Sequence, residues 1–269
     1  MQVHLKLVSD HPNRIVNARL LIEYELLRQQ MDDLAIRPMC EVFRSASTAS
    51  NQRSYFMLTV HHLGKSQSER IVWLCEELGI PYELKHTARD PVTILAPADY
   101  KALHPIGSAP VIIDVDLVLA ESGAIVEYII AKYGHGRLAL PASHPDFASY
   151  LYWFHFANGT LQANMGRLMI LNRLKLADDN PLLLATKARV DRAFDLVEAR
   201  TREAEYLAGS AFTTADIMMG FSLTTMRYFQ PYDLARCPNI VGYLARIGAR
   251  PAYRRAMEKG DPGMPLLLT

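Results

Sequence analysis

Side chains that could stabilise an anion occur in a short turn that follows a predicted strand. The turn, residues 64–68, leaves Ser66 and Ser68 at the beginning of a predicted helix. The free N–H groups and the positive end of a helix dipole attract anions, and a serine hydroxyl there could donate to a thiolate or a phosphate. The simpler interpretation is that Ser66 or Ser68 caps the helix by accepting a bond from a backbone N–H. On this turn alone, capping is favoured.

A second polar helix start follows a later predicted strand. Glu121 and Ser122 come directly after residues 117–120. The Ser122 hydroxyl and nearby N–H groups could hold a carboxylate, and Glu121 could hold an ammonium group, so the pair would suit the α-amino-acid end of a ligand. In isolation, a surface cap with an acid near the positive end of the helix is the simpler explanation.

Pro110 marks a third segment, between these two helix starts. It lies in HPIGSAPVI, residues 104–112, at the first position of a predicted strand, which is a place that proline tolerates. Because only about 5–6% of the peptide bonds before proline are cis, the residues by themselves predict a trans bond.

Strands and helices alternate around these motifs. The order strand, helix, strand implies two parallel strands with a right-handed crossover, and a hairpin around Val115–Asp116 follows. The expected strands are residues 57–63, 81–87, 109–114 and 117–120, and the expected helices are residues 69–79, 97–103 and 121–134.

No strand is predicted after residue 138. Thr213 and Asp216 have the spacing of a capping box, a folding feature to which we assign no catalytic role. The expected helices are a long aromatic one over 146–172, one from Pro181 to about Tyr206, one from Thr213, and two shorter ones from Pro238 and Pro251. The sequence therefore predicts a small α/β domain followed by an all-helical domain.

The composition is that of an ordinary globular protein and excludes several classes. Half of the 269 residues are hydrophobic, and 29 basic residues against 28 acidic ones give a formal charge of +1. This chain is too apolar for wholesale disorder and lacks the basic excess typical of a duplex-binding protein. No apolar run reaches membrane-spanning length, so we expect neither nucleic acid nor a membrane as partner.

The three cysteines, Cys40, Cys75 and Cys237, lie far apart. They form no CxxC pair and no Cys/His cluster at zinc spacing. We therefore expect neither a disulfide scaffold nor a bound metal. A reducing compartment, the cytoplasm, fits this pattern.

Residues 1–56 differ from the rest of the chain. Residues 13–31 have the apolar spacing of a helix, and residues 45–54 are small and polar, as in a flexible linker. The helix could bind a partner, but a lone amphipathic helix is marginal by itself. We favour a loosely ordered tail, or an upstream start included in the reading frame.

The order of these motifs, more than any one of them, resembles the cytosolic glutathione S-transferase family. The similarity covers roughly residues 57–260 and is closest to the bacterial and fungal branch, whose first strand reads HHL before a serine-containing turn. The segments that carry it are VHHLGKSQSERIVWLCEELGIPYEL, HPIGSAPVI, ESGAIVEYI, FTTADIMM and ARPAYRRAME.

The resemblance implies how the two domains divide their work. It implies a thioredoxin-like domain over residues 57–138 that binds glutathione as co-substrate. It also implies an all-helical domain over residues 144–262 that carries most of the second-substrate pocket, and a homodimer. Ser66 matches the serine that hydrogen-bonds the glutathione sulfur, although Ser68 and Lys65 beside it leave that assignment open.

The remaining contacts to glutathione are implied in the same way. Ala109 would present its backbone to the cysteinyl part, Pro110 matches the family's cis-proline, and Glu121 and Ser122 match the pair that holds the γ-glutamyl end. Ser108 departs from the pattern, because many relatives have lysine or glutamine at that position and use it on the tripeptide. Since Ser108 is shorter and uncharged, we expect weaker glutathione binding.

Thiol activation sets a quantitative requirement on the turn around Ser66. A thiol with a pKa of about 8.5 is only a few per cent ionised near pH 7, and the thiolate is the nucleophile. A hydrogen bond to a charged group contributes about 1.5–3 kcal/mol, which lowers a pKa by about one to two units. The helix end adds about 0.3–1 kcal/mol, so a lone serine could suffice without a general base.

We expect the second substrate to be a hydrophobic electrophile that lies against the aromatic helix over residues 150–165. The candidate contacts are Tyr152, His155, Phe156, Asn158 and Met165, although packing in the core or a dimer interface explains each of them as well.

Two other functions stay open. A glutathione-dependent disulfide reductase or peroxidase is disfavoured, because such relatives have cysteine near the position of Ser66 and because Cys75 reads as an inert buried thiol. A non-catalytic interaction module with the same fold is disfavoured by the intact Ser66, Glu121 and Ser122.

Overall fold

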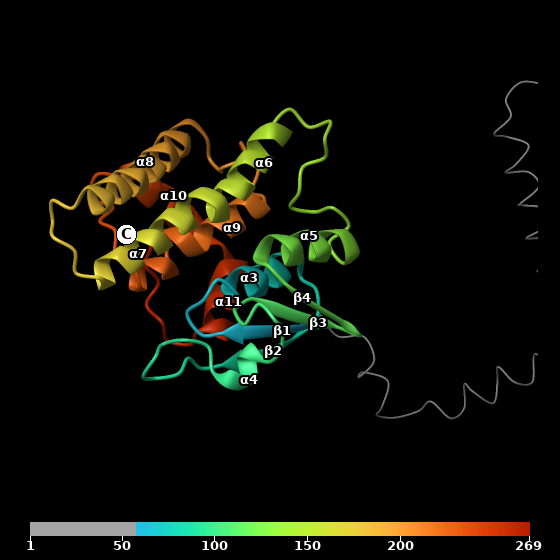
Figure 1. Ribbon diagram of the computed structural model, residues 1–269. Coiled ribbons are helices and arrows are strands. Elements are labelled where there is room, and N and C mark those ends of the chain that lie inside the picture. Colours follow the sequence, from blue (N-terminus) through green and yellow to red (C-terminus); the bar gives the residue numbers. More distant parts are fainter. Residues whose placement is uncertain (1–57) are drawn as a thin grey trace, which may run out of the picture. The chain divides into compact units, whose positions relative to one another are not determined.

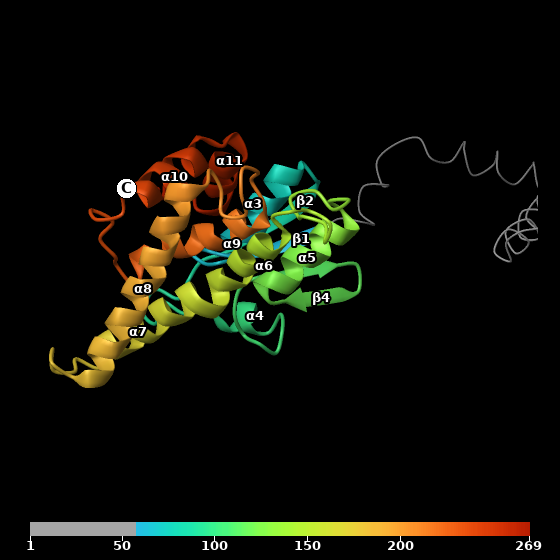
Figure 2. The same ribbon diagram turned by 90° about the horizontal axis from the view of Figure 1, so that it is seen from above.

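The computed structural model describes residues 58–269. The expected extension over residues 1–56, with its helix, its linker and Cys40, lies outside the described residues. Met57, the start of the first expected strand, lies outside them as well. The described chain forms an α/β half followed by a helical half, which is the fold class that the sequence predicts (Figure 1, Figure 2).

A mixed four-stranded sheet forms the centre of the α/β half. Its strands are Leu58–Leu63 (β1), Tyr82–Thr87 (β2), Val111–Asp114 (β3) and Leu117–Ala120 (β4), in the order β2-β1-β3-β4. β1 pairs in parallel with β2, so that His62 lies opposite His86, and antiparallel with β3. All six residues of β1 are buried because this strand lies inside the sheet. The predicted parallel pair and the predicted β3–β4 hairpin are therefore both present.

Three helices flank this sheet: α3 (Glu69–Leu78), α4 (Ala98–Lys101) and α5 (Ser122–Lys132). α3 and α5 lie on the face that turns toward the helical half, and α4 lies on the opposite face (Figure 1). α3 ends at Gly79, whose φ of 64° is left-handed, as its position after the last apolar residue predicts. The start of α3 follows the tight turn that carries Ser66.

The helical half contains the predicted helices with two differences. Its elements are α6 (Phe147–Phe156), a π-helical turn η1 (Ala157–Gln162), α7 (Ala163–Arg173), α8 (Pro181–Glu203), α9 (Thr214–Leu223), a 3₁₀ turn η2 (Thr225–Tyr228), α10 (Pro238–Ala249) and α11 (Pro251–Gly260). α8 ends at Glu203, before Tyr206, because Ala204 is extended. The prolines open α8, α10 and α11 as predicted.

The second difference is that the helix expected over residues 146–172 is not continuous. The wider π-helical turn η1 separates α6 from α7. Asn158 and Gln162 lie in this turn and accept hydrogen bonds from Arg70 of α3, at 2.8 Å and 2.9 Å. The interruption therefore coincides with polar contacts to the other half of the molecule, which is where such turns often occur.

Helix α9 is the centre of the helical half, and all ten of its residues are buried. Thr213 and Asp216 form the predicted capping box at its start. α9 approaches α3 closely, because a Cβ added to Gly220 would lie 2.8 Å from the Trp73 ring. This close packing, together with the ion pair between Arg250 and Glu77, fixes the two halves against each other.

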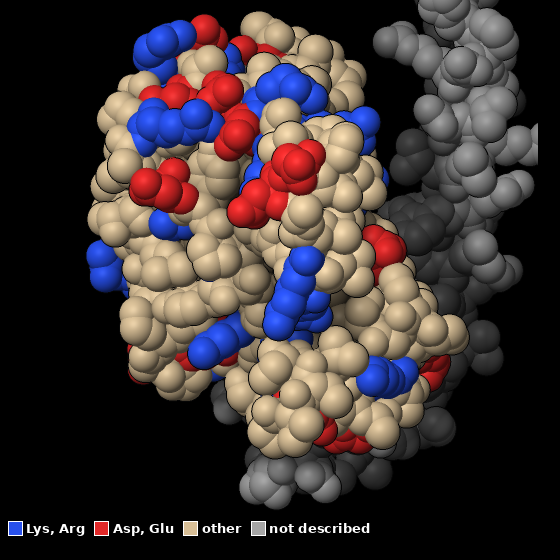
Figure 3. Space-filling view, turned by 60° about the vertical axis from the view of Figure 1, so that its left-hand side comes forward, with Lys and Arg blue, Asp and Glu red and all other residues tan. Residues whose placement is uncertain are grey.

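The surface of the described residues has no broad basic area on the face shown in Figure 3, where basic and acidic side chains are interspersed. Within residues 58–269, no helix combines the length and the apolar character needed to cross a membrane.

Candidate active site

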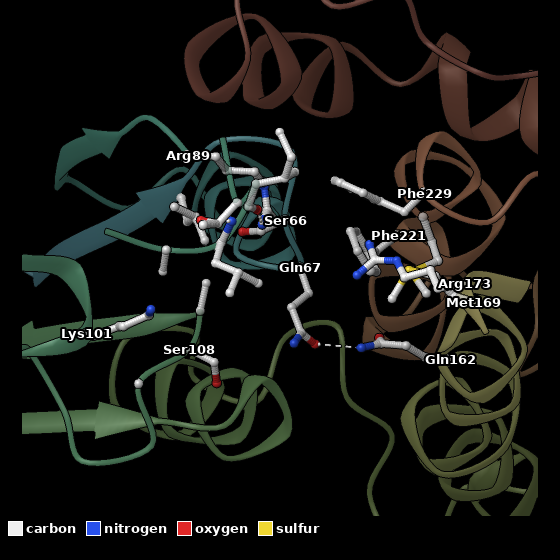
Figure 4. Close-up of a pocket in the computed structure, with 18 residues that line it drawn as sticks. Ser66, Gln67, Arg89, Lys101, Ser108, Gln162, Met169, Arg173, Phe221 and Phe229 are labelled. Atoms are coloured by element: carbon white, nitrogen blue, oxygen red, sulfur yellow. Dashed lines mark hydrogen bonds between the residues drawn. The ribbon is translucent and has the colours of Figure 1, made fainter. Parts of the chain in front are cut away.

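A cavity of about 450 Å³ opens between the α/β half and the helical half. In Figure 4, Ser66 and Ser108 approach it from the α/β half, and Met169, Phe221 and Phe229 approach it from the helical half. Arg89, Lys101 and Arg173 also line it, and among the described residues no acidic side chain does. The cavity therefore offers a net positive lining, with Arg89 and Lys101 from the α/β half and Arg173 from α7, and apolar contacts on the helical side.

Ser66 and Ser68 occupy different environments. Ser66 lines the cavity, and its Oγ accepts a hydrogen bond from the Ser68 backbone N–H at 3.2 Å. Ser68 is fully buried, and its hydroxyl accepts from the Leu63 N–H and lies 3.0 Å from His62 Nδ1. The Ser68 side chain makes no capping bond to α3, whereas the Ser66 hydroxyl satisfies the N–H of Ser68, the N-cap residue, so the capping interpretation holds for Ser66 only. The geometry leaves Ser66 as the serine that a ligand in the cavity could reach.

The polar groups behind Ser66 come from three parts of the chain. The hydroxyls of Ser66 and Ser68 lie 2.6 Å apart, and His62 Nε2 lies 3.1 Å from Asp261 Oδ2. Asp261 follows α11 and also accepts the Lys65 N–H at 2.9 Å. Asp261 thus holds the turn before Ser66 in place, with Lys65 at a φ of 51°.

A small pocket of about 30 Å³ extends the cavity toward α5 and shares Gln67, Ser108 and Ala109 with it. Pro110, Glu121 and Ser122 line this extension. The Ala109–Pro110 bond is cis, as the family resemblance implies, and the trans bond predicted from the residues alone is wrong. The residues expected from the sequence to contact glutathione therefore all line one continuous groove: Ser66, Ser108, Ala109, Pro110, Glu121 and Ser122.

Glu121 and Ser122 form the far end of this groove. Glu121 is exposed and adopts a φ of 72°, a left-handed conformation that is uncommon for residues other than glycine. The Ser122 hydroxyl is buried at the first residue of α5 and donates to Gln67 Oε1 at 3.3 Å.

Arg70 stands behind Ser122 and was not foreseen from the sequence. It is fully buried, and its Nη1 donates to Ser122 Oγ at 3.3 Å. Its other acceptors are the neutral side-chain amides of Gln67, Asn158 and Gln162. Gln162 also donates to Gln67 across the cavity, as Figure 4 shows. A buried cation with only neutral acceptors raises the electrostatic potential at the Ser122 end.

The residues expected to contact a second substrate do not line the cavity. Phe156 and Met165 are buried in the core, Tyr152 and His155 are exposed away from the cavity, and Asn158 bonds Arg70. The helical side of the cavity is lined instead by later residues of the same segment, Gln162, Met169 and Arg173, with Phe221, Met226 and Phe229. The spacing of 162, 169 and 173 is that of one helical face, a signal that could have identified them.

Cys75 is the buried thiol that the sequence predicts. It has no solvent exposure and no disulfide partner, and burial raises the pKa of its thiol. Of the two cysteines that the structure describes, neither lines the cavity.

Comparison with known proteins gives the same family at the level of sequence and of structure. A model of the glutathione S-transferase N-terminal domain matches residues 57–131, and a model of the C-terminal domain matches residues 146–251. Glutathione S-transferase 3 of Schizosaccharomyces pombe is 30% identical over 221 residues, which cover 76% of this chain and 88% of that protein.

Solved structures of similar proteins extend this comparison. A glutathione S-transferase of Actinobacillus pleuropneumoniae is 36% identical, with a TM-score of 0.69 over 76% of this chain and 93% of that one. A glutathione transferase of Burkholderia graminis, solved with two glutathione molecules per subunit, shares the fold. It is 24% identical, with a TM-score of 0.62 over 77% of this chain and 90% of that one.

Proposed function

This chain belongs to the glutathione S-transferase family, and on that premise we propose that it activates glutathione as a thiolate for attack on a hydrophobic electrophile, an alkyl or aryl transfer. Glutathione is its co-substrate. The observation that carries the proposal is the continuous groove that joins Ser66 to Glu121 and Ser122. A thiol at one end and an α-amino acid at the other are the two recognition features of the tripeptide.

Each part of glutathione then has its own partners. The γ-glutamyl carboxylate accepts from Ser122, with Arg70 behind it, and the ammonium group lies against Glu121. The cysteinyl backbone pairs with Ala109 beside Pro110, and the sulfur accepts from Ser66. The glycyl carboxylate lies toward Lys101, whose ammonium group lines the cavity near Ser108 (Figure 4). Lys101 thereby supplies the charge that Ser108 lacks.

The electrophile binds on the helical side of the same cavity. Met169, Phe221 and Phe229 line that side and present apolar surface toward Ser66. A thiolate held at Ser66 would face an apolar molecule there, which suits addition to, or displacement on, a hydrophobic carbon.

Other features of the family are proposed with it. We propose a homodimer in the cytoplasm and membership of the bacterial and fungal branch, on the motifs of the first strand and its serine turn. Sedimentation velocity at micromolar concentration would test the dimer, because a monomer and a dimer of this chain differ twofold in mass.

The reductase and peroxidase alternatives and the non-catalytic module predict different results in one activity panel. Purified protein is tested with glutathione and a chloronitrobenzene, a peroxide or a mixed disulfide, and for retention on immobilised glutathione. Turnover of the aryl halide supports the transferase. Faster turnover of the disulfide or peroxide supports the alternatives, and retention with no turnover supports the module.

The substitution Ser66→Ala tests the thiolate contact. Because one hydrogen bond to a thiolate contributes about 1.5–3 kcal/mol, kcat/KM of Ser66→Ala with the aryl halide should fall by about tenfold or more. Its melting temperature should stay that of wild type. Ser210→Ala, an exposed serine outside the cavity, is the matched control and should leave kcat/KM unchanged. Unchanged turnover in Ser66→Ala would instead assign the sulfur contact to the backbone or to Ser68.

A further inference from the structure

A chain of side-chain contacts leads from the cavity into the protein interior. It runs from Ser66 Oγ to Ser68 Oγ at 2.6 Å, on to His62 Nδ1 at 3.0 Å, and from His62 Nε2 to Asp261 Oδ2 at 3.1 Å. Only Ser66 lines the cavity, and the side chains of Ser68 and His62 have no solvent exposure. Hydroxyls and an imidazole can each both give and take a proton.

Asp261 determines which nitrogen of His62 carries the proton. Burial alone would raise the pKa of Asp261, but the hydrogen bonds that it accepts from His62 and from the Lys65 N–H contribute to lowering it below its ordinary value. Asp261 is therefore ionised at neutral pH and accepts from His62 Nε2–H. In neutral His62 the lone pair then lies on Nδ1, which faces Ser68.

This tautomer sets the direction of the hydroxyl bonds before glutathione binds. Ser68 donates its hydroxyl proton to Nδ1, and Ser66 donates its own to Ser68 Oγ. One lone pair of Ser66 Oγ accepts the Ser68 N–H, the other is then left for the cavity, and the Ser66 proton is directed away from the cavity. In this state Ser66 accepts a hydrogen bond from a thiol and cannot donate one to a thiolate.

We propose that this row of hydrogen-bonded side chains conducts the proton of the glutathione thiol to His62, an inference that rests on the proposed function. The S–H bond breaks as a new O–H bond forms on Ser66. The original Ser66 proton moves to Ser68, and the original Ser68 proton moves to Nδ1. The products are a thiolate and an imidazolium, with both hydroxyls intact and pointing the other way.

The transfer also creates the hydrogen bond that holds the thiolate. After it, imidazolium Nδ1–H donates to Ser68, Ser68 donates to Ser66, and Ser66 donates to the sulfur. Asp261 pairs with the positive ring. Ser66 is the catalytic residue because it touches the sulfur, and Ser68, His62 and Asp261 are positioning residues that act through it.

Other ionisable groups lie near these side chains, and a measurement of pH dependence has to distinguish their effects from those of His62 and Asp261. The His86 ring of β2 lies 5.6 Å from the His62 ring, centroid to centroid, and the charge of His86 lowers the pKa of Asp261. The charge of Asp261 in turn raises the pKa of Glu69 of α3 and of Arg89 after β2. His86 makes no hydrogen bond to Ser66, Ser68, His62 or Asp261, so His86→Gln is the control that removes its charge near Asp261 without breaking a contact of the chain.

The number of protons released when glutathione binds distinguishes transfer of the thiol proton to His62 from its loss to solvent. Glutathione is added to wild-type protein in weak buffer with a pH indicator, and thiolate is followed by its ultraviolet absorbance. S-methylglutathione, which has no thiol, gives the background. We expect thiolate to form with far less than one proton released per thiolate, and the His62 nitrogens to show an imidazolium by NMR. Release of one proton per thiolate would overturn the proposal.

Two substitutions remove proton acceptance while keeping hydrogen bonds. In His62→Asn the amide nitrogen can donate to Ser68 from the place of Nδ1, and in Asp261→Asn the amide can accept from Lys65 and donate to His62 Nε2. In both, the rising limb of kcat/KM against pH should move up by at least about one unit, a tenfold loss at neutral pH. Affinity for S-methylglutathione should stay within about twofold of wild type.

The outcomes separate the proposal from its premise. An unshifted pH profile in a folded His62→Asn or Asp261→Asn protein, or a shift of the same size in His86→Gln, would overturn the proton path. Absence of any thiolate absorbance or glutathione binding in wild type would reject the proposed function instead. The wild-type proton count needs no variant, so it decides the matter even if both variants unfold.

Discussion

The two ends of the groove are each marked by a serine near the start of a helix, Ser66 and Ser122, and different polar groups lie behind the two serines. Behind Ser66 lie a hydroxyl, an imidazole and the ionised carboxylate of Asp261. Behind Ser122 lie the Arg70 guanidinium and neutral amides, and within residues 58–269 no carboxylate bonds Arg70. One end is closed by an anion and the other by a cation.

This difference separates proton movement from charge recognition. Every group behind Ser66 can exchange a proton, so that end can change state during a reaction. The amides behind Ser122 do not titrate near neutral pH, and although burial lowers the pKa of Arg70 to about 9, the guanidinium stays charged there. The Ser122 end therefore supplies a fixed positive potential for a carboxylate, and the Ser66 end supplies a route for a proton.

Glu69 interacts electrostatically with Arg70 behind one end and with Asp261 behind the other, and it offers the largest test of their separation. It is buried and accepts from Thr225 at 2.6 Å, and burial raises its pKa to about 8. Since its pKa in the unfolded chain is about 4.3, the folded protein keeps the proton over a range where the unfolded chain loses it. The free energy of unfolding should therefore fall, on the order of 3 kcal/mol from this group, between about pH 5 and 7.5.

Glu69→Gln keeps the shape and removes this titration. Urea melts at pH 5 and pH 7.5 measure the free energy of unfolding of the variant and of wild type. This free energy should change less with pH in the variant. Asp216, whose pKa is raised to about 6 by burial, acts in the same direction and remains in both proteins. Parallel pH profiles for the two proteins would show that Glu69 is ionised in the folded state and joins the two ends electrostatically.

Arg70 gives the next largest effect and tests the fixed-charge end. Arg70→Gln should weaken binding of S-methylglutathione about 30-fold, or about 2 kcal/mol, because the carboxylate at Ser122 loses the charge behind its donor. Calorimetry measures the affinity, and steady-state kinetics should show the loss in KM, with kcat within about threefold. Arg70→Lys, which keeps the charge but not the planar fork, should fall between the two. A loss confined to kcat would contradict the division between the ends.

The parts of the fold that depend on local signals could be predicted from the sequence. Gly79 ends α3, Thr213 and Asp216 cap α9, and prolines open three helices where the spacing of residues indicates. The π-helical turn was not predictable, because it depends on contacts of Asn158 and Gln162 with Arg70, which is 88 positions away from Asn158. No local sequence pattern predicts a contact between residues so far apart in the chain.

Some residues of the site could likewise be predicted from short motifs, and others could not. Ser66, Pro110 and Ser122 lie in strand–turn or strand–helix junctions, so short motifs could locate them. Asp261 is 199 positions from His62 and follows a helix that looks ordinary, so only the fold brings it behind the turn. Arg70 resembles any polar residue in the first turn of an amphipathic helix, and its burial depends on the packing of the helical half over α3.

Lys101 gives the smallest effect and tests whether the glycyl carboxylate lies in the cavity. Its side chain is exposed at the end of α4, so a contact with a carboxylate is screened and contributes about 0.5 kcal/mol. Lys101→Gln should weaken glutathione binding about two- to threefold at low salt, and the difference from wild type should vanish near 1 M salt, where the screening length is about 3 Å. Lys187→Gln, an exposed lysine of α8 outside the cavity, is the matched control. The loss of affinity in Arg70→Gln should persist at high salt, because that cation is buried. A loss of affinity in Lys101→Gln that does not depend on salt would mean that Lys101 maintains the shape of the groove and does not bind the ligand carboxylate through its charge.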